Sequence, residues 1–148
     1  MVINKVLTAK MLSIVAQAFE GKFDKAGEPY FEHCYCVMVL LGENADEEEK
    51  QMALGHDLFE DTKITAQYLR ECGFSERVIA GIMSMTKMLG YSYEEYKTQV
   101  KDNPDSIKVK MADLTHNSDI RRMKDGATSK DFERVQNYMA FYEELKKM

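Results

Sequence analysis

GHDLFEDT, residues 55–62, places four acidic or imidazole side chains in eight positions: His56, Asp57, Glu60 and Asp61. The stretch ends a helix that we predict for residues 46–61, where side chains three or four positions apart share one face. Carboxylates gathered in a poorly hydrated cleft repel one another and are costly to desolvate. A bound divalent cation removes that cost, so the octet predicts part of a metal site.

One helix cannot close such a site, and two further polar residues interrupt segments that otherwise look buried. His33 lies in the apolar segment 30–42, and Asp113 lies beside the apolar stripe of a helix predicted for residues 106–123. With His56 and Asp57 they supply two nitrogen and two oxygen donors, which leaves coordination positions open for water and substrate. Imidazole and carboxylate ligands suit zinc, manganese or iron better than calcium.

Apolar residues recur at spacings of three and four along the chain, and no segment shows the alternation typical of a strand. The pattern predicts an all-α fold of about seven or eight helices in a single domain spanning residues 1–148. A loop is predicted for residues 124–129. The predicted helices cover residues 5–20 (beginning at Asn4 or Thr8), 30–42, 46–61, 64–72, 75–88, 92–102, 106–123 and 130–147.

Composition narrows the possible partners. The formal net charge of −5 disfavours binding to a nucleic-acid polymer, because such binding depends on lysine and arginine. No run reaches the roughly 18 apolar residues of a membrane span, and the three cysteines form no CxxC pair. We therefore expect a soluble cytoplasmic protein without a membrane partner. The broadly apolar last helix predicts either closure of the core or a homodimer face.

Four motifs resemble those of one family in identity, order and separation. They are KAGEPYFEH (25–33), ALGHDLFEDT (53–62), MTK (85–87) and KVKMADLTHN (108–117). Together they resemble the HD-domain metal-dependent phosphohydrolases. The similarity is greatest to the hydrolase domain of the stringent-response (p)ppGpp synthetase/hydrolases and to their small stand-alone relatives.

The resemblance implies a compact multi-helix HD architecture and hydrolysis that releases pyrophosphate from the 3′ side of a guanosine tetra- or pentaphosphate. The implied metal is manganese, with zinc, iron or magnesium as alternatives, and the implied partner is a small nucleotide or another phosphorylated small molecule. The implied metal ligands are His33, His56, Asp57 and Asp113. Glu60 and Asp61 would orient or activate the attacking water, and Lys25, Lys87 and Asn117 would contact the substrate.

The chain also departs from the family pattern around the substrate. Asp24 stands where the family has an arginine that packs against guanine, Leu114 replaces a second arginine, and Ile120 replaces a threonine. These differences keep two alternatives open. One is an HD phosphohydrolase acting on another nucleotide or phosphorylated metabolite, and the other is a non-catalytic nucleotide-sensing module. The alternative interpretation of Glu60 and Asp61 is a solvated helix end, and His116 is expected to support a metal ligand or to be structural.

Overall fold

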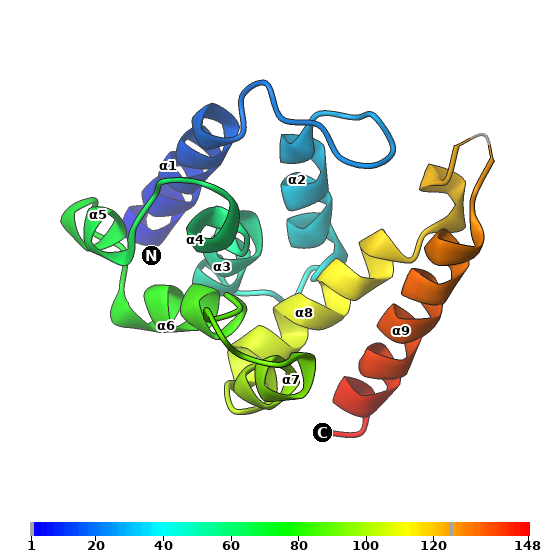
Figure 1. Cartoon of the computed structure of the whole chain (residues 1–148). Helices are drawn as coiled ribbons and strands as arrows, with labels where there is room; N and C mark the ends of the chain where they lie inside the picture. Colours follow the sequence, from blue (N-terminus) through cyan, green and yellow to red (C-terminus); the bar gives the residue numbers. More distant parts are fainter. Residues whose placement is uncertain (1, 125) are drawn as a thin grey trace.

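Helices form the regular structure in this computed structural model, which describes residues 2–124 and 126–148 (Figure 1). Within those residues there is no strand, and an isolated antiparallel bridge joins Phe23 to Pro29. The predicted all-α class is confirmed. The helices are α1 (Val2–Ala18), α2 (Tyr30–Leu40), α3 (Glu47–Gly55), α4 (Leu58–Asp61), α5 (Ala66–Glu71), α6 (Glu76–Ser84), α7 (Tyr93–Lys101), α8 (Pro104–Asn117) and α9 (Ser129–Lys146), with a 3-10 helix η1 (Ile120–Arg122) after α8.

Side-chain caps begin the helices that carry or support the site. The Asp46 carboxylate accepts the Glu49 amide hydrogen at 2.8 Å, and the Glu49 side chain accepts the Asp46 amide in return. Thr128 and Asp131 form the same reciprocal box at the start of α9. The Asn103 side chain accepts two amide hydrogens at the start of α8. Each cap satisfies amide groups that the first helical turn leaves without partners.

Three predicted helices are shorter than expected, and the one predicted for residues 75–88 ends at Ser84. The helix predicted for 46–61 breaks at His56 and Asp57, because the His56 Nδ1 atom hydrogen-bonds the Ala53 carbonyl oxygen at 2.7 Å. That carbonyl is the acceptor that a continued helix would offer to the Asp57 amide. The helix predicted for 106–123 ends at Asn117 and continues only as η1. The predicted loop 124–129 includes Asp125, which lies outside the described residues.

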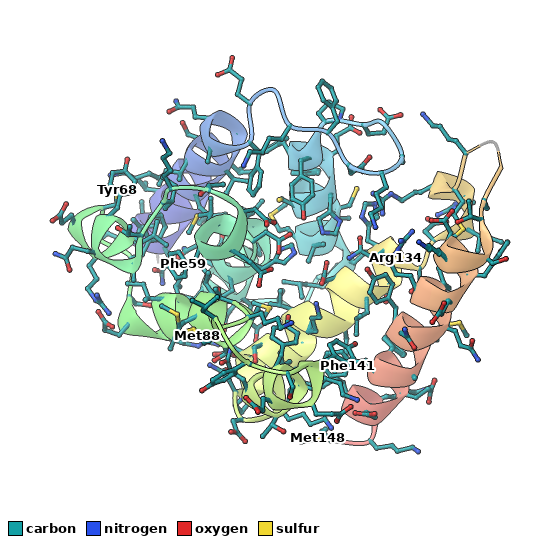
Figure 2. The ribbon with its side chains drawn as sticks, viewed as in Figure 1. Phe59, Tyr68, Met88, Arg134, Phe141 and Met148 are labelled. Atoms are coloured by element: carbon teal, nitrogen blue, oxygen red, sulfur yellow. The ribbon has the colours of Figure 1, made fainter. Side chains whose placement is uncertain are left out.

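The core lies where α2, α3 and α8 meet, and α1 and α6 pack on the other sides of α3 (Figure 1). A second apolar cluster seats α9 against α7 and α8, with Phe141 between these helices (Figure 2). Leu114, which replaces an arginine of the family pattern, belongs to this second cluster and is 1% exposed. The last helix therefore packs onto the body of the fold, which is one of the two roles that the sequence left open for it. No helix in the described part of the chain is long and apolar enough to cross a membrane.

Candidate active site

Three separate parts of the fold bring the four predicted metal ligands together. His33 projects from α2, His56 and Asp57 lie at the break between α3 and α4, and Asp113 projects from α8. The Nε2 atoms of His33 and His56 lie 3.0 and 3.4 Å from Asp113 Oδ1. The same nitrogens lie 3.9 and 3.1 Å from Asp57 Oδ2. Ligand atoms of His33, His56 and Asp113 all lie within 4.8 Å of one another, a spacing that fits one metal ion.

His56 provides the clearest sign that a cation belongs here. Its Nδ1 atom faces the Ala53 carbonyl oxygen, so this nitrogen carries the hydrogen and Nε2 presents a lone pair. The Nε2 atom is buried and has no hydrogen-bond partner, although it faces carboxylate oxygens of Asp57 and Asp113. A lone pair facing two carboxylates is repulsive unless a cation lies between them. A backbone carbonyl on the other ring nitrogen is also the usual support for a metal-binding histidine.

Asp113 is held by a lysine and an amide on its own helix. The Lys110 Nζ atom lies 2.8 Å from Asp113 Oδ2, and Asn117 Nδ2 donates to Asp113 Oδ1 at 2.9 Å. Burial of Asp113 opposes its ionisation, but the positive charge of Lys110 holds its pKa well below the usual range. Asp113 is therefore a negatively charged carboxylate with a fixed orientation. Asn117 contacts the site through its hydrogen bond to Asp113, which is a predicted metal ligand.

Two aromatic side chains orient the remaining ligands. The Tyr30 hydroxyl donates to Asp57 Oδ2 at 2.5 Å. The His116 ring stacks on His33 at 4.9 Å between centroids, and the two Nδ1 atoms lie 2.7 Å apart. Burial and the charge of Arg122 lower the pKa of His116 to about 4, so His116 is neutral. His116 thus supports His33, in line with the structural role expected for it.

Glu60 and Asp61 lie beside the metal ligands and form a second acidic group with Asp57. Glu60 Oε1 accepts the Lys87 amide hydrogen at 2.8 Å, which fixes the carboxylate. Partial burial and the neighbouring charges of Asp57 and Glu60 raise the pKa of Asp61. A carboxylate with a raised pKa is a better proton acceptor, so Asp61 can serve a water held at the metal site.

A cleft of about 590 Å³ opens next to the cluster. Of the predicted substrate contacts, Lys25 and Asn117 line it, whereas Lys87 does not belong to its wall. Ile120, where the family has a threonine, is 69% exposed and also lies outside the wall. The lining residues are Phe23, Asp24, Lys25, Ala26, Tyr30, His33, Asn117, Asp119, Arg122, Met123, Lys124, Gly126, Asp131, Arg134 and Tyr138.

Sequence reasoning missed several residues of this site. Tyr30 lies inside the quoted motif KAGEPYFEH, so its tyrosine was a usable signal. Lys110 lies in KVKMADLTHN, three residues before Asp113, a spacing that places both on one helix face. Arg134 and Tyr138 carried no such signal, because they reach the cleft only through the packing of α9.

Comparisons with known proteins find similar chains. The chain is 31% identical over 115 residues to the guanosine-3′,5′-bis(diphosphate) 3′-pyrophosphohydrolase of Haemophilus influenzae. This match covers 70% of the present chain and 17% of the relative. It is 31% identical over 117 residues to a GTP pyrophosphokinase of Myxococcus xanthus, covering 69% of this chain and 15% of the relative. It is 29% identical over 116 residues to the bifunctional (p)ppGpp synthase/hydrolase SpoT of Escherichia coli K12, covering 70% and 16%.

These curated relatives are much longer proteins, and the chain spans only 15 to 17% of their length. No family model matches the chain. A solved structure of a metazoan ortholog of SpoT, a protein that hydrolyzes ppGpp and plays a role in starvation responses, superposes with a TM-score of 0.74. The two chains are 20% identical, and the match covers 93% of this chain and 84% of the other. The expected multi-helix architecture is thus confirmed.

Proposed function

We propose that this chain, which shares the fold and the sequence motifs of the HD-type (p)ppGpp hydrolases, is a single-domain, metal-dependent phosphohydrolase. The proposed reaction releases pyrophosphate from the 3′ side of a guanosine 3′,5′-bis(diphosphate). The observation that carries the proposal is the buried His56 Nε2 atom, which faces two carboxylates from different elements beside a cleft of about 590 Å³. A purely structural histidine would have a hydrogen-bond partner there.

The proposed division of labour follows from the contacts. His33, His56, Asp57 and Asp113 hold the divalent ion, which we propose to be manganese. When bound, the ion lowers the pKa of a coordinated water and withdraws charge from a phosphoryl oxygen. Glu60 and Asp61 then orient that water and accept its proton. Lys25 lines the cleft and neutralises phosphate charge there, whereas Lys87 would do so from the rim, next to Glu60.

Asp24 favours a second candidate within the same reaction class. It lies in the cleft wall, and its carboxylate is bound to Arg122, so the position that supports guanine in the family carries no free cation here. An HD phosphohydrolase acting on another nucleotide or phosphorylated metabolite fits this difference. A non-catalytic nucleotide-sensing module remains the alternative from a different class. The charge of −5 is consistent with a small-molecule partner, and a homodimer through α9 stays a prediction.

A screen of phosphate and pyrophosphate release decides among these candidates. Purified protein loaded with manganese is incubated with ppGpp and with a panel of other nucleotides and sugar phosphates. The proposal expects pyrophosphate and GDP from ppGpp in equal amounts. Turnover of another ester without release from ppGpp would support the second candidate, and no turnover of any compound would support the sensing module.

Replacing Tyr30 by phenylalanine is expected to weaken manganese binding about 10-fold or more, because Asp57 loses the hydroxyl that orients it. A competition titration with a metal-sensitive dye measures the change. Tyr35→Phe is the matched control, since Tyr35 lies on the same helix and is 45% exposed. Equal affinities for the Tyr30→Phe variant and the wild type would show that the hydroxyl does not support the metal site.

Manganese is expected to raise the melting temperature of the protein, because the ion relieves repulsion between the buried carboxylates of Asp57 and Asp113. At a free concentration about 100 times Kd, binding contributes ~2.7 kcal/mol, which corresponds to roughly 6 to 10 °C in a chain of this size. Differential scanning calorimetry with and without manganese measures the shift, and EDTA should reverse it. A melting temperature independent of manganese would contradict a metal site at this cluster.

A further inference from the structure

Arg122 is the most firmly positioned cation of the cleft wall. Its Nη2 atom donates to Asp24 Oδ2 at 2.5 Å, and its Nη1 atom donates to the His116 carbonyl oxygen at 2.9 Å. The two bonds attach different nitrogens of one planar group to two separate elements, so they fix the orientation of the guanidinium plane. The side chain is 21% exposed, which leaves part of that group open to the cleft.

Asp24 serves as the anchor of this arginine and not as a ligand contact of its own. Its Oδ1 atom accepts the amide hydrogens of Ala26 and Glu28 at 2.9 and 3.0 Å, while Oδ2 is occupied by Arg122. The side chain is only 7% exposed. Asp24 therefore ties the loop after α1 to η1, and the group that this tie presents to the cleft is the guanidinium of Arg122.

Two other cations of the wall, Arg134 and Lys124, are held differently. Arg134 binds Asp131 one turn away on α9, and Lys124 reaches Glu28 at 3.1 Å with 62% of its side chain exposed. Within the described part of the chain, neither side chain is bound from two separate elements, so neither presents a guanidinium plane in a fixed orientation. Tyr138 adds an aromatic ring to the same wall, and His33 and Asn117 lie at the metal end. The cleft wall thus combines a fixed guanidinium plane with an aromatic ring.

Such a combination suits a flat, unsaturated ring. A guanidinium plane stacks on aromatic rings and nucleobases, whereas a lysine ammonium acts as a point charge. We propose that Arg122, anchored by Asp24, holds the base of the nucleotide in this cleft and so determines specificity between nucleotides and simpler phosphates. The inference rests on the proposed function insofar as the substrate is a nucleotide.

Binding measurements with two probes test the assignment. Isothermal titration calorimetry with GDP and with inorganic pyrophosphate, both in the presence of manganese, compares a ligand that has a base with one that lacks it. Arg122→Gln is expected to weaken GDP binding at least about 10-fold and to leave pyrophosphate binding within about 2-fold. Arg122→Lys should behave like the glutamine variant, because it keeps the charge and loses the plane. Asp24→Asn should weaken GDP binding in the same direction.

The neighbouring Arg121 offers a matched control. Its side chain is 88% exposed and binds Asp119, so Arg121→Gln removes the same charge from the same short helix without touching Asp24. GDP affinity should not change in this variant. Circular dichroism and the melting temperature of each variant show whether a loss of binding reflects unfolding, and Arg122→Lys provides the conservative comparison.

The outcomes separate this inference from the proposed function. Retained GDP affinity in Arg122→Lys, or an equal loss of GDP and pyrophosphate binding in Arg122→Gln, would make Arg122 a phosphate contact and overturn the inference. Wild-type protein that binds GDP no better than pyrophosphate would also overturn it. If Arg122→Gln selectively loses GDP but the wild type does not hydrolyse ppGpp, the base contact stands and only the proposed reaction fails.

Discussion

Replacing Asp113 by asparagine is expected to reduce turnover at least about 1000-fold and to abolish stoichiometric metal binding. Asp113 Oδ1 is the oxygen that faces both His33 Nε2 and His56 Nε2, at 3.0 and 3.4 Å. Asparagine matches the shape of aspartate but removes the negative charge that a divalent ion requires at this point. Metal analysis after gel filtration and a pyrophosphate-release assay measure the two effects.

The controls for this variant address charge and folding separately. Asp102→Asn makes the same chemical change at an exposed position after α7 and should leave metal content and turnover unchanged. Asp113→Asn also leaves the Lys110 ammonium without its anionic partner, which is 2.8 Å away in the wild type. The double variant with Lys110→Met removes both charges and restores the balance. A folded Asp113→Asn protein with full metal content would exclude Asp113 as a ligand.

The class of the fold was predictable because helical periodicity is a local property of the sequence. Spacings of three and four recur in the apolar residues of every long segment, and the caps at Asp46, Asn103 and Thr128 lie where such patterns begin. The break at His56 and Asp57 was not predictable from that pattern. It depends on the His56 side chain taking the Ala53 carbonyl, a competition that the periodicity of apolar residues does not report.

The gathering of the proposed metal ligands was predictable for a different reason. His33 and Asp113 are polar residues on buried helices. Because a buried charge needs a partner, each of them indicated a contact with another segment of the chain. The far wall of the cleft gave no comparable signal. Arg122 and Asp24 are 98 positions apart and look like ordinary surface residues in sequence. Their pairing exists only because η1 and the loop after α1 are brought together by the packing of α2 and α8.

Replacing Glu60 by glutamine, or Asp61 by asparagine, is expected to lower turnover by roughly 100- to 10,000-fold while metal binding persists. The reason is that both carboxylates lie beside the proposed metal ligands without being needed to close their cluster. Glutamine can still accept the Lys87 amide hydrogen that Glu60 Oε1 accepts at 2.8 Å, so the local structure should survive. Steady-state assays of pyrophosphate release and metal analysis on the same preparations measure the two quantities.

Glu43→Gln is the control, because Glu43 is an exposed residue of the loop after α2 and belongs to neither group of potential metal ligands. The two site variants also separate an enzyme from a sensor. An enzyme loses turnover in Glu60→Gln and keeps its metal, whereas a sensing module shows the same ligand-induced change in melting temperature with or without the acidic side chains. Full turnover in both variants would show that neither carboxylate handles the proton of the attacking water. Loss in only one of them would assign the proton acceptor to that residue.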